Sequence, residues 1–156
     1  VSAQVLCEFL NKTLAAEQPN PKIYRLTLSS INMIKCNDSI ERLSSIVYSS
    51  LLIATALLGF QPHLKTCVRC QKRPSNLFSI KYGGFICIRH EDKDAVSLPT
   101  QIISDLHRIY YKMAPLIDLK NIDLLEKLVK EYIRYHFEGI ELKTLKFLKK
   151  QELVLI

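Results

Sequence analysis

The chain has 156 residues, and its 22 lysines and arginines against 15 aspartates and glutamates give a net charge of +7 at pH 7. This length predicts one domain, large enough to bury a core without support from metal or disulfides. The most apolar run, residues 46–58, is shorter than the roughly 20 residues that a membrane-spanning helix needs, and no signal peptide is visible. We therefore expect a soluble, cytoplasmic protein with no membrane contact.

Residues 1–62 carry three predicted helices. The first, over 1–14, has an apolar stripe at three- and four-residue spacing. Asn20 and Pro21 predict the N-cap and first position of the second helix, and Asp38 with Glu41 resembles a capping box that opens a third helix. Gly59 is the expected end of that helix, which is apolar nearly all round from residue 46 and should be the buried centre of the fold. The predicted inward residues of the first two helices are Val1, Val5, Leu6, Phe9, Leu10, Leu14, Ile23, Leu26, Ile31 and Ile34.

Two short cysteine-containing motifs follow. Cys67 and Cys70 enclose two residues, and sixteen residues later Cys87 and His90 have the same spacing. The segment 82–85 reads as a tight turn between β-prone runs at 78–82 and 85–88, so a hairpin would bring the two motifs together. Four such ligands suit a tetrahedral Zn²⁺ site, and because they leave no open position, the predicted metal is a single structural zinc.

Other interpretations of this quartet explain less of it. A redox pair accounts for Cys67 and Cys70 alone, and buried free cysteines would need no regular spacing. The interval differs from the classical finger, and the HxE motif of zinc deaminases is absent. Outside the quartet, Cys7 and Cys36 lie in apolar helical patterns, and we expect buried thiols in a reducing compartment.

Beyond the quartet the pattern returns to helices. Residues 97–99 begin a predicted fourth helix that Pro115 ends, and Asn121 or Asp123 begins a fifth that stops at Gly139. A last short helix is expected over about 142–148. The predicted inward residues are Ile102, Ile103, Leu106, Ile109, Tyr110 and Met113 in the fourth helix, and Leu124, Leu125, Leu128, Val129, Tyr132 and Ile133 in the fifth. The fold class is thus mainly α, a single helical bundle-like domain over 1–156 with a zinc-binding β-hairpin insert at about 64–93.

Positive charge gathers in two places. Residues 65–93 hold seven basic residues against two acids, and a second cluster without acids lies near the C-terminal end. Such clusters suit a polyanion or an acidic peptide, although a solvated charged face is the alternative. The candidate binding residues are Lys65, Arg69, Lys72, Arg73, Lys81, Arg89, Lys143, Lys146, Lys149 and Lys150. Phe60, Tyr82 and Phe85 are candidates for stacking on bases, against the alternative that they belong to the core.

Several motifs together resemble the RecO family of bacterial recombination mediators. The run LLGFQPHL at 57–64 leads directly into the first cysteine pair, as in that family, and Phe78-Ser79, Gly83-Gly84 and the second pair match its next segment. The stretch around Pro19-Asn20-Pro21 and the run LKTLKFL at 142–148 resemble its inter-domain and C-terminal segments. Gln71 departs from the family, which often has glycine there, and His90 replaces the commoner fourth cysteine.

The resemblance implies a non-enzymatic role in DNA repair. RecO-like proteins bind single-stranded DNA, anneal strands, engage the acidic tail of single-strand-binding protein and load recombinase with RecR. The tail, which ends in an apolar side chain, needs an apolar pocket rimmed by cations, which the third helix and its neighbours could provide. The family's N-terminal OB-fold has no counterpart before Val1, so we expect a C-terminal fragment or a protein without that domain. An interaction adaptor with a structural zinc and no direct DNA binding is the alternative.

An enzyme is the least supported class. His63, His107 and His136 are the histidines outside the quartet, and none lies in a nucleophile motif with a serine or cysteine. The GxGxxG, Walker and HExxH motifs are absent. The sequence therefore favours a binding protein over a catalyst.

Overall fold

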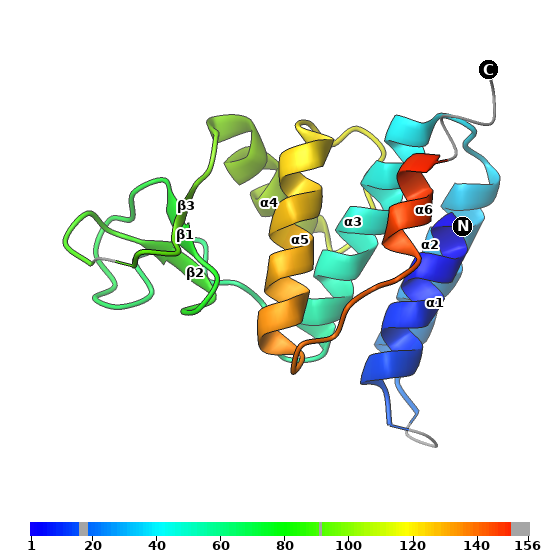
Figure 1. Ribbon diagram of the computed structural model, residues 1–156, viewed down its shortest axis with the longest axis horizontal. Coiled ribbons are helices and arrows are strands. Elements are labelled where there is room, and N and C mark those ends of the chain that lie inside the picture. The colour runs from blue at the N-terminus through cyan, green and yellow to red at the C-terminus, as the bar shows by residue number, and fades with distance from the viewer. Residues whose placement is uncertain (16–18, 91, 151–156) are drawn as a thin grey trace.

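A computed structural model describes residues 1–15, 19–90 and 92–150, with the side chains of 149 and 150 left out, and shows helices at one end and a small sheet at the other (Figure 1). Within these residues the helices are α1 (Ser2–Thr13), α2 (Pro21–Lys35), α3 (Ile40–Leu57), α4 (Thr100–Lys112), α5 (Ile122–His136) and α6 (Leu145–Lys150). The strands are β1 (Leu77–Ser79), β2 (Gly84–Ile86) and β3 (Val96–Ser97). The predicted mainly α class with a β insert is confirmed.

Helix α3 is the centre of the fold, as predicted. Residues 44–55 are all buried, and α1, α2, α4, α5 and α6 each contact this helix. Its 18 residues have a mean hydropathy of 1.3, so by length and composition alone the helix could cross a membrane. However, 67% of them are buried inside the protein. A core helix has these same properties, so α3 is weak evidence for a membrane span.

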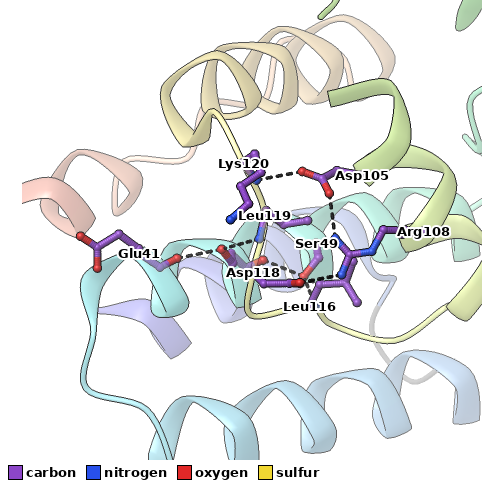
Figure 2. Close-up of polar contacts among 9 residues, drawn as sticks. Glu41, Ser49, Asp105, Arg108, Leu116, Asp118, Leu119 and Lys120 are labelled. Carbon is purple, nitrogen blue, oxygen red and sulfur yellow. Dashed lines mark hydrogen bonds and ion pairs between the residues drawn. The ribbon is translucent and has the colours of Figure 1, made fainter. Parts of the chain in front are cut away.

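Serine hydroxyls on α3 satisfy backbone groups of the segment between α4 and α5. Ser49 Oγ accepts from the backbone N–H of Leu116 at 2.9 Å, and Ser45 Oγ accepts from that of Leu119 at 3.2 Å. Figure 2 shows this segment held between α3 and α4, where the buried Asp105 accepts from the N–H of Lys120 at 2.8 Å. A loop packed on a core helix needs such partners, because unpaired buried N–H groups are costly.

Three predicted helix ends are confirmed, whereas α5 ends at His136 and not at Gly139, and α6 is Leu145–Lys150 and not about 142–148. Asn20 caps α2 by accepting from the N–H of Ile23 at 3.1 Å, with Pro21 in the first turn. Gly59 has φ +97°, and the N–H groups of Gly59 and Phe60 donate to Ala56 and Thr55, which is a Schellman motif. Asn121 is the N-cap of α5.

The predicted cap of α3 is wrong. Ser39, and not Asp38, is the N-cap, and its hydroxyl donates to the carboxylate of Glu41. The start of α4 is also later than predicted, because β3 occupies Val96–Ser97 and Pro99 is the N-cap. Ser97 belongs to β3 because it pairs with β1 in an antiparallel arrangement. No local sequence pattern predicts this pairing.

Burial departs from prediction at a few positions. Cys7 and Cys36 are exposed, since Cys7 lies on the outer face of α1 and Cys36 follows the last turn of α2. Ile31 and Ile34 are only half-buried. Met113 is 38% exposed, because the chain turns into the left-handed region there with φ +49° and leaves α4.

The sheet has the order β2-β1-β3, with both pairs antiparallel. Leu77 pairs with Ile86 and Phe78 with Phe85, so the predicted hairpin is confirmed with shorter strands. Gly84 belongs to β2 and not to the turn. A Cβ at this position would lie 2.4 Å from the carbonyl oxygen of His63, so only glycine allows the segment before the insert to approach β2 so closely.

Candidate metal centre and nucleic-acid interface

The four predicted ligands meet at one point. The ligand atoms of Cys67, Cys70, Cys87 and His90 all lie within 4.8 Å of one another. The Nδ1 atom of His90 is 3.2 Å from the sulfur of Cys87 and 3.4 Å from that of Cys67, and the sulfurs of Cys70 and Cys87 are 3.7 Å apart. A tetrahedron of ligands about 2.3 Å from zinc has edges of about 3.8 Å, so the cluster has the dimensions of a zinc site. His90 faces it with Nδ1.

The first pair lies in a tight turn after the LLGFQPHL run. The N–H of Cys67 donates to the carbonyl of Lys72, and the N–H of Gln71 donates back to Cys67, both at 2.8 Å. The turn places Gln71 in the left-handed region at φ +60°. This geometry gives a physical reason why glycine would suit the position after the second cysteine.

The second pair is positioned by β2. Cys87 directly follows this strand, and the N–H of His90 donates to the carbonyl of Cys87 at 3.0 Å, which folds the second turn. The N–H of Val68 donates to the carbonyl of Phe85 at 2.9 Å and ties the first turn to the same strand. The ligands therefore depend on the register of one short strand.

Electrostatics favour the thiolate at Cys67 but not at Cys70, where a backbone hydrogen bond at Lys72 is outweighed by burial and by hydrogen bonds with the other sulfurs, which raise the pKa. Burial raises the pKa of Cys67, but hydrogen bonds from the backbone N–H groups around it, at Arg69, Cys70 and Cys87, outweigh burial and lower that pKa to about 6. Thiolate is the form that binds zinc. Three sulfurs and one imidazole nitrogen complete a tetrahedral shell, so a metal bound here would have no free position for a reacting water. The donor set therefore fits one structural Zn²⁺.

The insert is attached to the helices through α5. The hydroxyl of Tyr132 donates to the carbonyl of Phe60 at 2.9 Å, and Nε2 of His136 donates to the carbonyl of Ile80 at 2.8 Å. The Tyr132 ring also lies 6.2 Å from that of Phe78. The sequence places Tyr132 on an inward face, but its periodicity contains no signal for these two long-range hydrogen bonds.

The structure exposes the six candidate cations of the insert and separates them from the C-terminal cluster. Lys65, Arg69, Lys72, Arg73, Lys81 and Arg89 are all exposed, and none forms an ion pair within the described part of the chain. Lys143 and Lys146 are also exposed, just before and within α6, and this helix lies on the other side of α5 from the sheet (Figure 1). The side chains of Lys149 and Lys150 lie outside the described residues. The two clusters therefore form two separate surfaces.

Of the three candidate stacking residues, Phe85 belongs to the core, which is the alternative given for it. It is 2% exposed and packs edge-on against Phe78 at 5.4 Å, because β2 turns it into the core. Phe60 is 38% exposed and lies 4.6 Å from the ring of Phe137. Tyr82 is half-buried beneath the guanidinium of Arg69, which is 4.8 Å from the ring centre and donates to the hydroxyl. Tyr82 therefore orients a cation.

A family model described as recombination protein O C terminal matches residues 1–146. Among curated relatives, the DNA repair protein RecO of Bacillus subtilis is 27% identical, with 96% of this chain and 60% of the relative covered. The DNA repair protein RecO of Bacillus cytotoxicus is 26% identical, with 95% of this chain and 61% of the relative covered. The chain thus spans about three fifths of the length of these relatives. No solved structure matches it significantly.

Proposed function

Because the chain belongs to the family of recombination protein O C-terminal regions, we propose that it acts in DNA repair as the helical and zinc-binding part of a recombination mediator. In this role it binds single-stranded DNA and single-strand-binding protein in the bacterial cytoplasm, at the nucleoid. It promotes annealing and, with RecR, recombinase loading, without catalysing a reaction itself. Family membership over nearly the whole chain is the observation that carries the proposal.

The exposed cations of the insert support DNA binding. Six exposed lysines and arginines of the insert have no ion-pair partner in the described chain, so their charges are available to phosphates. Ser79 donates to the carboxylate of Asp92, which also accepts from the N–H of Asp94 at 3.1 Å. The carboxylate of Asp92, one of the two acids in this basic segment, is thus held by the fold of the insert.

A triple variant tests the proposal. Neutralising Arg69, Lys72 and Arg73 to glutamine should weaken binding to a single-stranded oligonucleotide and reduce the slope of log K against log salt by about two, since each phosphate contact on a single strand contributes about 0.7. The matched control neutralises Lys35, Lys112 and Lys127, which are exposed on the helices. Equal affinity of parent and insert variant would show that these cations do not bind DNA.

A pocket beside α3 suits the acidic tail of single-strand-binding protein. Its volume is about 440 Å³. Leu26, Ile53 and Leu57 form apolar lining, Lys22 and Arg25 stand exposed at its rim, and no carboxylate lines it. An apolar terminal side chain in the pocket would place the tail's carboxylates beside these cations.

The alternative function, an interaction adaptor without DNA contact, rests on the same pocket. An acidic peptide ending in Asp-Phe should bind the parent and lose affinity in Arg25→Glu. If the peptide binds while the oligonucleotide does not bind at any salt concentration, the adaptor is the correct function. If the oligonucleotide binds with a steep salt dependence, the mediator proposal is supported.

A further inference from the structure

A groove separates the helices from the zinc insert. One wall is the segment 61–65 that leads into the insert, and the other is the outer face of α4; the volume between them is about 800 Å³. The wall at 61–65 is fixed to the sheet, because the N–H of His63 donates to the carbonyl of Gly83 at 2.8 Å and its carbonyl accepts from Phe85 at 3.0 Å. The groove is therefore built by the way in which the insert is attached.

The α4 wall is a polar stripe opposite the core. Ser104, His107, Arg108 and Tyr111 line it at helical spacing, about 180° around the helix from the buried Ile102, Leu106 and Ile109 at 100° per residue. The stripe is about 10 Å long at 1.5 Å per residue. Tyr111 is 91% exposed, so its ring is free to stack on another planar group.

Among its described lining residues, the groove has one uncompensated cation, Lys65. No carboxylate is among its lining residues, and Lys65 is exposed on the opposite wall without an ion pair in the described chain. Arg108 is already compensated, because it contacts Asp105 at 2.9 Å and Asp118 at 2.7 Å. The wall at 61–65 also adjoins the hairpin turn, since the N–H of His63 donates to the carbonyl of Gly83, two positions after Lys81.

We propose that this groove holds a short stretch of single-stranded DNA. One base stacks on Tyr111, and the backbone phosphates contact Lys65 and continue toward Lys81 and Arg69. The inference rests on the proposed function, and it adds the path and the stacking residue. Every base offers a π face, so stacking on an exposed tyrosine needs no particular sequence. An acidic peptide with an apolar end is less suited, because polar side chains line most of the groove, whereas Leu26, Ile53 and Leu57 line the pocket beside α3.

The chain contains no tryptophan, so Tyr111→Trp adds a unique fluorophore in the groove. Titration with oligo-dT should quench it, whereas Tyr24→Trp, at another exposed tyrosine (68%) on α2, should remain unquenched. Tyr111→Ala should weaken oligo-dT binding about five- to a hundredfold, the range for losing one stacked base, and Tyr111→Phe should retain the parent's affinity. Tyr111→Ala should leave the salt slope unchanged, and Lys65→Gln should reduce it.

The outcomes separate the two proposals. If the parent binds oligo-dT but Tyr111→Ala binds equally well, or the fluorescence of Tyr111→Trp is not quenched at saturation, the groove proposal is wrong and the insert cations still account for DNA binding. If the parent does not bind, the proposed function fails, and the groove proposal with it. If an Asp-Phe peptide quenches the fluorescence of Tyr111→Trp and oligo-dT does not, the groove binds a protein partner and the DNA path is overturned.

Discussion

The Nε2 atom of His136 donates a hydrogen bond to the carbonyl oxygen of Ile80 at 2.8 Å, across 56 positions of sequence. One turn earlier on α5, the hydroxyl of Tyr132 donates to the carbonyl of Phe60 at 2.9 Å. The two side chains also lie against each other, with ring centres 4.3 Å apart. The last turns of α5 therefore fix both the entrance of the insert and the turn of its hairpin.

Tyr132→Phe should lower the free energy of unfolding by about 1 kcal/mol, because it removes one hydrogen bond and leaves the ring in place. Hydrogen exchange at residues 80–86 should become faster, since the insert would be held less firmly. Tyr135→Phe is the control, because Tyr135 is 54% exposed on the same helix. Chemical denaturation measures the free energy of unfolding of both variants. Equal losses of stability in the two would contradict the attachment through α5.

The metal centre predicts about one zinc per chain by elemental analysis of the purified protein. Cys67→Ser should lose the metal and loosen the hairpin while most of the helical circular dichroism remains, because a small cluster around Cys67, Ile86 and Cys87 is separate from the main core. Cys7→Ser, on the exposed face of α1, should retain the zinc. Complete unfolding of Cys67→Ser would show that the metal supports the whole domain.

Gln71→Gly should stabilise the protein. The left-handed conformation at φ +60° costs a residue with a Cβ roughly 1 kcal/mol, and glycine avoids this strain, offset in part by its greater freedom in the unfolded chain. We expect a gain of about 0.5 kcal/mol in thermal or chemical unfolding. The neighbouring Lys72 does not have positive φ, so Lys72→Gly should be neutral or destabilising; a similar gain there would refute the explanation.

Glu8 predicts a specific loss of stability in acid. Burial raises its pKa, but hydrogen bonds from Lys12, from the hydroxyl and N–H of Thr144 and from the N–H of Lys143 lower it from 4.5 to about 2. Because the folded pKa lies below the unfolded one, the stabilisation is complete above about pH 5 and is lost as the pH falls toward 2. The carboxylate joins α1 to the start of α6.

Glu8→Gln should therefore lower the free energy of unfolding by about 1–2 kcal/mol at pH 7. This loss is smaller than the full pKa shift implies, because the side chain is 15% exposed to solvent. The difference from the parent should shrink steadily between about pH 5 and pH 2. Glu131→Gln is the control, since its ion pair with Arg134 is about half exposed and should contribute little. A constant difference across this pH range would contradict the assigned pKa.

Local chemistry explains which predictions from the sequence are confirmed. Asn20 and Gly59 are recognised because a cap depends on residues within four positions of it. The predicted cap at Asp38 is wrong because Ser39 offers an equivalent side chain one position later, and local patterns do not choose between them. The predicted burial of Cys7 is wrong because helical periodicity gives the inner stripe only to within about one residue on each side.

By itself the sequence determined the helices and the metal quartet, because periodicity, caps and two-residue ligand spacing all act over a few neighbouring residues. Only the tertiary structure decided how the insert is attached, since the hydrogen bonds of Tyr132 and His136 join segments more than fifty residues apart. It also separated the two basic clusters and placed Lys65 opposite Tyr111 across one groove. Such surfaces arise from packing between elements, and the packing depends on contacts that no local pattern records.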